Sequence, residues 1–408
     1  MPPHRATPAV AVVLAAALAL VPGPTGCSVF RNPRDPGDVD SNKVVANHPA
    51  QLAPPIADSL AAALAKPTGP IACPKNILAV SGGGQYAAYN AGLVVGWTET
   101  GTRPKFDVVT GVSSGAIVAC YAFLGERYDP NLTRFFTQTR RRDLFVFRPV
   151  VELFRNGSLA SSKRLEELIA TEVNDCFLFD LREAHKEGRR LYLGSTNARS
   201  KRLTVWDVGA IACSDRPDAA DLVRKVILAS IAYPGILPPV SFDIVVNGQR
   251  FEEEHTDGGA VSQAFVRLGP GGERPAPGVT GWLTGSNLYA MAAGKLFPPR
   301  AQGQLNIFSR IGSSLSGSLY ALYRAELTGM YAFCGVSGMQ YHMIAIPDDA
   351  EVPDNSMSFE VEAMRRLYTL GHQAAKGGIP WRTTPPGTVP GEEEQPIGPE
   401  VFAPAKKR

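Results

Sequence analysis

The sequence has little excess charge of either sign and few cysteines. Its 408 residues include 41 lysines and arginines against 38 aspartates and glutamates, a net charge of +3. A dedicated nucleic-acid-binding protein usually has a strong basic excess, so we predict no nucleic-acid partner. Six cysteines in a chain of this length do not make a disulfide-stapled scaffold, and their spacing fits no metal site. We therefore expect neither a metal nor another cofactor.

The N-terminus lacks an apolar run of the length that a membrane-spanning helix needs. The stretch from Pro8 to Val21 is about 14 residues long, against about 20 for a span, and it follows a short basic start. This pattern is typical of a secretory signal peptide. We predict such a peptide over residues 1–26.

The end of this segment, Pro24-Thr25-Gly26-Cys27, resembles a bacterial lipobox, although Pro24 stands where an aliphatic residue is usual. The resemblance implies that Cys27 is acylated, for example with palmitate, and becomes the mature N-terminus. The protein would then be anchored in the bacterial cell envelope, facing the periplasm or the exterior, and Ser28 is compatible with the outer membrane. Cleavage without lipidation and an uncleaved anchor are the alternatives.

Composition divides the rest of the chain into three parts. Residues 27–70 predict a flexible tether, because Arg31 to Asp40 holds Pro, Gly, Asp and Asn with no apolar period. Residues 384–408 are rich in Pro, Gly and Glu and predict a disordered tail. Residues 71–383 carry the apolar periodicity, show no internal repeat, and fit one large α/β domain.

Short apolar runs alternate with helical patterns through this domain. We predict strands over 77–80, 106–110, 191–195, 203–208 and 341–346, and a hairpin over 244–251. We predict helices over 85–96, 116–124, 222–232 and 316–329, and one capped by Ser358 that ends at Gly377. Such alternation favours a mainly parallel sheet with helices on both faces, a three-layer α/β/α arrangement.

The sharpest motif is Gly111-Val112-Ser113-Ser114-Gly115, a G-x-S-x-G pattern between a predicted strand and a predicted helix. This is the context of a nucleophile elbow, in which Gly111 and Gly115 permit a sharp turn and Ser113 stands at its apex. The following helix N-terminus favours a developing anion near Ser113.

Two glycine-rich turns accompany this motif. Ser81-Gly82-Gly83-Gly84 follows the first strand of the domain, and successive glycine N–H groups can bind an oxyanion. Asp257-Gly258-Gly259 follows an acidic run and can bring a carboxylate close to another backbone. Each turn taken alone also fits an ordinary loop.

The order of these three elements, with the segment from Leu228 to Pro239, resembles the patatin-like phospholipase family. The resemblance covers about residues 75–270; Tyr86 and Ala87 depart from it, which affects headgroup recognition more than the chemistry. It implies a patatin-like fold and a lipid acyl-ester hydrolase with a Ser113–Asp257 dyad. It also implies an oxyanion hole formed by Gly82, Gly83, Gly84 and Ser114, with Gly258 and Gly259 completing the Asp-Gly-Gly turn.

Other chemistries stay open on the sequence alone. An α/β-hydrolase triad in the order Ser, Asp, His would recruit His342 or His372, which follow Asp257 in the chain. His255 lies two residues before Asp257 and would share its face in a strand, so it is a third candidate. A catalytically silent lipid-binding or envelope interaction lipoprotein is a second alternative, and an acyltransferase using the same dyad is a third. The basic and aromatic stretch over 134–148 predicts either a cap that touches anionic lipid or a solvated helix face beside core aromatics.

Overall fold

A computed structural model of the chain describes residues 75–147, 158–246, 249–268, 281–297, 307–389 and 392. The predicted signal peptide, Cys27, the tether and most of the predicted tail lie outside these residues. Within the described C-terminal part, the Arg382 guanidinium donates to the Glu392 carboxylate at 2.7 Å. This contact joins residues on the two sides of residue 383, where we place the domain boundary, and that boundary stays a prediction.

The central sheet has the strand order β10-β9-β1-β2-β5-β8-β7, with β6 paired to β5. The five strands from β10 to β5 run parallel, and β6, β7 and β8 join by antiparallel pairing. The strands are β1 (Asn76–Val80), β2 (Val108–Val112), β5 (Arg190–Asn197), β6 (Leu203–Asp207), β7 (Val240–Val246), β8 (Gln249–Asp257), β9 (Asn287–Met291) and β10 (Gln340–Ile344).

Two separate hydrophobic clusters cover the two faces of this sheet. In β1, Leu78 and Val80 join one cluster, whereas Ile77 and Ala79 join the other, as the two-residue period of a strand requires. The first face is covered by α4 (Ala87–Glu99), α5 (Ser114–Leu124), α6 (Asp129–Gln138), α9 (Lys163–Glu172), α10 (Asp175–Lys186), α12 (Ala219–Ile231) and α14 (Val361–Lys376).

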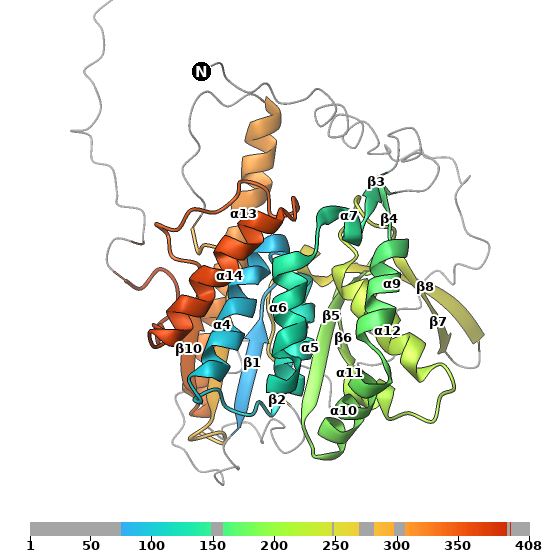
Figure 1. Cartoon of the computed structure of the whole chain (residues 1–408), viewed down its shortest axis with the longest axis horizontal. Helices are drawn as coiled ribbons and strands as arrows, with labels where there is room; N and C mark the ends of the chain where they lie inside the picture. Colours follow the sequence, from blue (N-terminus) through green and yellow to red (C-terminus); the bar gives the residue numbers. More distant parts are fainter. Residues whose placement is uncertain are drawn as a thin grey trace, which may run out of the picture.

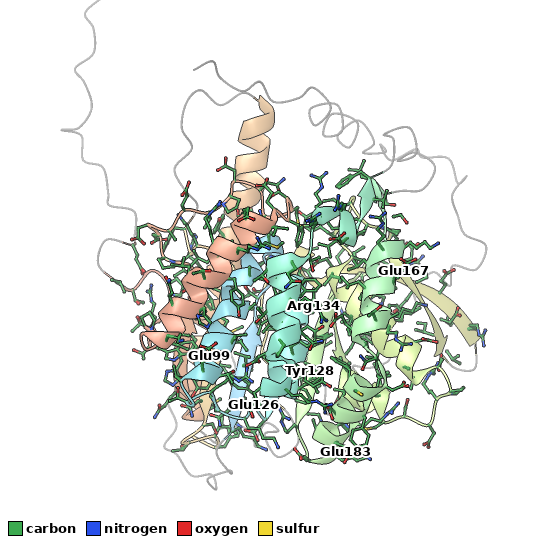
Figure 2. All side chains as sticks on the ribbon, viewed as in Figure 1. Glu99, Glu126, Tyr128, Arg134, Glu167 and Glu183 are labelled. Carbon is green, nitrogen blue, oxygen red and sulfur yellow. The ribbon has the colours of Figure 1, made fainter. Side chains whose placement is uncertain are left out.

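The second face is covered by α13 (Ile307–Ser337), whose Tyr323, Leu327 and Met330 lie in the second cluster. Figure 1 shows α4, α5, α6 and α14 in front of the strands and most of α13 behind them. The fold is therefore the predicted three-layer α/β/α arrangement with a mainly parallel sheet. Glutamates on the outer side of the first helical layer are exposed, as Figure 2 shows for Glu99, Glu126, Glu167 and Glu183.

Smaller elements complete the described chain. The helices α7 (Arg141–Leu144) and α11 (Val208–Ala212) are short, and β3 (Val146–Phe147) pairs with β4 (Ala160–Ser161). Three 3₁₀ turns are η1 (Gly84–Tyr86), η2 (Glu126–Tyr128) and η4 (Gly258–Ala260).

The predicted elements are present, with differences at their ends. The strand predicted from residue 106 begins at Val108, and the helix predicted over 316–329 is α13, which runs from Ile307 to Ser337. The hairpin of β7 and β8 is present, while its predicted turn at 247–248 lies outside the described residues.

The prediction that Ser358 caps the last helix is wrong. The helix α14 begins at Val361, and the Ser358 hydroxyl instead accepts a hydrogen bond from the Gln85 amide at 2.6 Å. The end of this helix at Gly377 is as predicted.

Candidate active site

Strand β2 turns directly into helix α5 at Ser113. The backbone of Ser113 has φ 55° and ψ −137°, a conformation that non-glycine residues rarely adopt. Neighbouring glycines make room for it, because a Cβ on Gly115 would lie 2.2 Å from the Ser81 carbonyl oxygen and one on Gly111 would lie 2.6 Å from the Ala119 Cβ. This is the strand–turn–helix geometry that the G-x-S-x-G motif predicts.

Asp257 lies at the end of β8 and faces this elbow. The Ser113 hydroxyl donates to Asp257 Oδ2 at 2.5 Å, and the Gly259 N–H donates to Asp257 Oδ1 at 2.7 Å. Only 2% of Asp257 is exposed. Burial raises the pKa of the Asp257 carboxyl to about 7, although the hydrogen bonds from Ser113 and Gly259 favour its ionised form. The fold thus brings together two residues that lie far apart in the sequence.

The C-terminal end of α12, from Ser230 to Ala232, fixes the backbone of both Ser113 and Asp257. The Ser113 N–H donates to the Ser230 carbonyl at 3.0 Å, and the Asp257 N–H donates to the Ala232 carbonyl at 2.8 Å. The Ser230 hydroxyl in turn donates to the Gly194 carbonyl on β5 at 2.8 Å. Ser230 and Ala232 lie in the segment from Leu228 to Pro239, whose sequence predicts no such role, because a main-chain carbonyl can accept a hydrogen bond whatever its side chain is.

The loop Ser81–Gly84, here called the oxyanion loop, lies against the elbow. The Gly82 N–H donates to the Gln263 carbonyl at 3.0 Å. It is therefore already bonded, and we withdraw Gly82 as an oxyanion donor. The N–H groups of Gly83, Gly84 and Ser114 have no acceptor among the described residues, so these three predicted donors are available.

Neighbouring backbone leaves no space for a side chain at Gly83 or at Gly84. A Cβ on Gly83 would lie 2.1 Å from the Ala293 carbonyl oxygen, and one on Gly84 would lie 2.2 Å from that of Ser356. Gly84 also has a φ of +57°, which favours glycine. Packing on both sides therefore fixes this loop and explains why glycines occupy it.

A narrow apolar pocket of about 40 Å³ opens beside Ser113 and Asp257. Gly84 and Ser114 also line it, and the rest of its wall is apolar: Ile117, Phe135, Leu144, Phe145, Leu165, Ile231, Leu237, Met357 and Phe359. A second apolar cavity of about 30 Å³ shares four of these residues, Ile117, Phe135, Leu165 and Ile231. The two cavities together extend from the elbow between α5, α6, α9 and α12.

None of the candidate histidines bonds to this pair. His255 is fully buried, with Nδ1 at 2.9 Å from the Ser195 hydroxyl and Nε2 at 3.3 Å from Glu253. His342 stacks on Tyr289, and His372 pairs with Glu99 at 2.9 Å. Because the Ser113 hydroxyl donates directly to Asp257, the geometry favours a dyad over a histidine triad.

Among the described residues, no group of three or more His, Cys, Asp or Glu side chains gathers in a way that could hold a metal ion. The described helices include none with the length and apolarity needed to cross a bilayer.

Comparison with known proteins shows which family this part of the chain resembles. Residues 78–268, which contain the elbow, Asp257 and Gln263, match the family model described as patatin-like phospholipase. This part of the chain is similar to patatin-like phospholipases. This match supports lipid hydrolysis as the activity, and no curated protein sequence matches the chain.

Two solved structures are similar at low identity. VipD from Legionella pneumophila is 14% identical with a TM-score of 0.32, over 74% of this chain and 67% of that one. The type III effector protein ExoU is 12% identical with a TM-score of 0.32, over 74% of this chain and 52% of that one, so the chain spans about half of its length.

Proposed function

We propose that the chain hydrolyses acyl esters of lipids, as a phospholipase A or a lysophospholipase does, through a Ser113–Asp257 dyad. The observation that carries this proposal is the 2.5 Å hydrogen bond from the Ser113 hydroxyl to the buried Asp257 carboxylate. A serine hydroxyl is a weak nucleophile unless a base takes its proton, and Asp257 is the base within reach.

The geometry supports a two-step acyl transfer. Ser113 Oγ attacks the ester carbonyl while its proton passes to Asp257 Oδ2, and the N–H groups of Gly83, Gly84 and Ser114 stabilise the oxyanion. The C–O bond to the leaving alcohol then breaks as Asp257 returns the proton to it, which leaves an acyl-enzyme. Water then loses a proton to Asp257 and attacks the acyl carbon. The bond from Ser113 Oγ to the acyl group breaks, Ser113 takes the proton back from Asp257, and the fatty acid leaves. A pKa of about 7 suits Asp257 to accept and return a proton at neutral pH.

The pocket supports a lipid as the substrate. Its wall beside Ser113 is apolar apart from the reacting groups, and the adjoining cavity continues this apolar surface away from the elbow. An acyl chain gains about 0.8 kcal/mol for each methylene that it buries, so a long-chain ester is favoured over a short polar one.

One edge of the domain supports contact with a lipid surface, and we name α7 and β3 (Arg141–Phe147), with Arg140 before them, the entrance edge. Leu144 and Phe145 point inward and line the catalytic pocket. Arg140, Arg141 and Arg142 are exposed, and so is Phe147, at 42%. Basic side chains around an exposed aromatic ring suit the headgroup region of an anionic bilayer. Figure 1 shows this edge at one end of the helical layer.

The proposed membrane anchor is a lipidated Cys27, which lies outside the described residues. Metabolic labelling of the full chain with an alkyne fatty acid in a bacterial host should mark the wild type and not a Cys27→Ala variant. Equal labelling of both would remove Cys27 as the lipidation site.

The test of the catalytic proposal is a burst experiment with a p-nitrophenyl acyl ester. We expect Ser113→Ala and Asp257→Asn each to reduce turnover by roughly 1000-fold or more, because the nucleophile and its base act as a unit. The matched controls are Ser214→Ala and Asp218→Asn. Ser214 lies two residues after α11 and its hydroxyl donates to the Ile211 carbonyl, and Asp218 is a surface aspartate paired with Arg216.

The outcomes separate the alternatives. Substantial turnover in either purified dyad variant overturns the role of that residue. An acyl-enzyme that forms but passes its acyl group to an added alcohol faster than to water indicates an acyltransferase. A folded wild type that forms no acyl-enzyme, even with micelles present, points to a lipid-binding protein.

A further inference from the structure

A half-buried glutamate on the far face of the sheet connects to the candidate active site through hydrogen bonds. Glu326 is the one acidic residue in the sequence between Ile307 and Ser337, and it lies on α13. Its carboxylate oxygen Oε2 accepts the N–H of Gln263 at 2.9 Å and the N–H of Ala264 at 3.0 Å. Both bonds join α13 to the loop that follows the Asp-Gly-Gly turn.

Burial makes this position costly for a carboxylate. Desolvation raises the pKa of Glu326 to about 7, and its hydrogen bonds from the loop favour the ionised form. An apolar side chain would fill the same space without the desolvation cost that a carboxylate has. Its hydrogen-bond partners, the backbone N–H groups of Gln263 and Ala264 and the Ser262 side chain, all lie in this loop, so the glutamate's evident task is to fix the loop.

Gln263 passes this constraint in two directions. Its carbonyl oxygen accepts the Gly82 N–H at 3.0 Å, which orients the oxyanion loop just before Gly83 and Gly84. Its side-chain amide donates to the Gly259 carbonyl at 2.5 Å. The Gly259 N–H in turn donates to Asp257 Oδ1 at 2.7 Å. One residue therefore bonds both to the loop that supplies oxyanion donors and to the turn that holds the catalytic base.

We propose that Glu326 is a positioning residue, which sets the oxyanion loop against the Asp257 turn (Asp257–Ala260) through Gln263. The proposal rests on the proposed acyl-ester hydrolysis, since it concerns the same site. Glu326 lies outside residues 78–268, so the match to the family supplies no role for it. Its effect is on the transition state, in which the donors and the base must be placed together, and hardly on substrate binding.

The experiment compares Glu326→Ala, Glu326→Gln and Thr328→Ala. Thr328 is exposed on the same helix and its hydroxyl donates only to the Arg324 carbonyl, so it controls for changes in α13. We expect Glu326→Ala to lower kcat on the order of 100-fold with little change in KM. We also expect it to slow fluorophosphonate labelling of Ser113 by a similar factor. Glu326→Gln should recover most of both rates, because its amide oxygen can accept the same N–H groups.

Hydrogen exchange provides a readout that does not depend on activity. Glu326→Ala should speed exchange in peptides covering residues 81–84 and 257–264 and leave α4 and α14 unchanged. Unchanged exchange there, or an unaltered kcat in a variant with a lower melting temperature, would show that Glu326 only stabilises the fold. If Glu326→Ala does not fold, Gln263→Ala tests the link to the Asp257 turn, because it removes the amide that bonds to Gly259 and keeps the main-chain bonds to Glu326 and Gly82. Unchanged kcat and unchanged exchange at 257–260 then overturn the proposed positioning through Gln263. If the wild type has no esterase activity and Glu326→Ala still speeds exchange at 81–84 and 257–264, the proposed function is refuted and the positioning role is retained.

Discussion

At the scale of single residues, the candidate site combines two features that cost stability. Ser113 adopts a backbone conformation that a non-glycine residue rarely takes, and Asp257 places a carboxyl group where little solvent reaches it. Both features are useful for acyl transfer, because the first exposes the nucleophile and the second adjusts the base to neutral pH. Activity needs the ionised form of Asp257, whereas burial favours its protonated form, so pH should move activity and stability in opposite directions.

The substitution Asp257→Asn tests this opposition. The folded-state pKa is about 7 against an ordinary 3.8, so the folded protein binds the proton more tightly than the unfolded chain. The wild type should therefore lose stability as the pH rises from about 4 to about 7, by a few kcal/mol. Because the variant has no charge to bury, it should be more stable than the wild type at pH 8, with a smaller difference at pH 5.

Urea unfolding at the two pH values measures this difference, and wild-type kcat/KM should rise with pH across the same interval. Asp218→Asn, at an exposed ion pair, is the control and should show no such advantage at pH 8. An Asp257→Asn difference that stays constant between pH 5 and pH 8 contradicts the raised pKa.

At the scale of elements, the first turn of α5 packs directly on the oxyanion loop. A Cβ on Gly115 would lie 2.2 Å from the Ser81 carbonyl oxygen and 2.8 Å from that of Val80. Gly115→Ala should therefore separate the elbow from the loop, with a loss of activity of at least about 100-fold and a lower melting temperature.

Gly335→Ala is the matched control for this substitution. Gly335 is also a helical glycine, on α13, but nothing lies within 4 Å of a Cβ placed there. Alanine favours a helix over glycine by up to about 1 kcal/mol, so this variant should keep its activity and be equally or more stable. Equal activity in both variants would show that the contact between Gly115 and Ser81 does not matter.

The elements of this site differ in how well sequence predicts them. The elbow follows from local signals, because an apolar strand, two glycines and an apolar helix adjoin Ser113 in the chain. The bond from Gly82 to Gln263 joins residues distant in sequence, and no local pattern marks a carbonyl as an acceptor, so Gly82 was assigned as a donor. The length of α13 was missed because residues 307–315 mix Ser, Gly and Arg with the apolar residues and show no clear period.

At the scale of the whole molecule, the C-terminal part of the chain completes a site that the N-terminal and middle parts begin. Ser113 and the oxyanion loop come from the first third of the domain and Asp257 from β8. Met357 and Phe359, beyond the stretch matched by the family, line the catalytic pocket, and Glu326 supports it from the opposite face. We infer that residues 78–268 alone would carry the dyad without its complete pocket.

The entrance edge gives the last prediction, because it would place this pocket at a lipid surface. Phe147 is exposed, and the Arg141 guanidinium lies 4.2 Å from the centre of its ring, so one arginine and one aromatic ring face solvent together. In a Cys27→Ala background, which lacks the proposed anchor, Phe147→Asp should weaken binding to phosphatidylglycerol-containing vesicles by about 10-fold. It removes apolar contact and adds a charge that an anionic surface repels.

Phe179→Asp is the control for this prediction, since Phe179 is 59% exposed on α10, away from the catalytic pocket, and should bind vesicles as the wild type does. Sedimentation with vesicles measures both variants, and binding of the parent protein should fall as salt screens the arginines. Hydrolysis of a soluble p-nitrophenyl ester should stay unchanged in Phe147→Asp, because its side chain does not line the pocket. If both substitutions weaken vesicle binding equally, the entrance edge has no special role and the molecule meets lipid through general surface hydrophobicity.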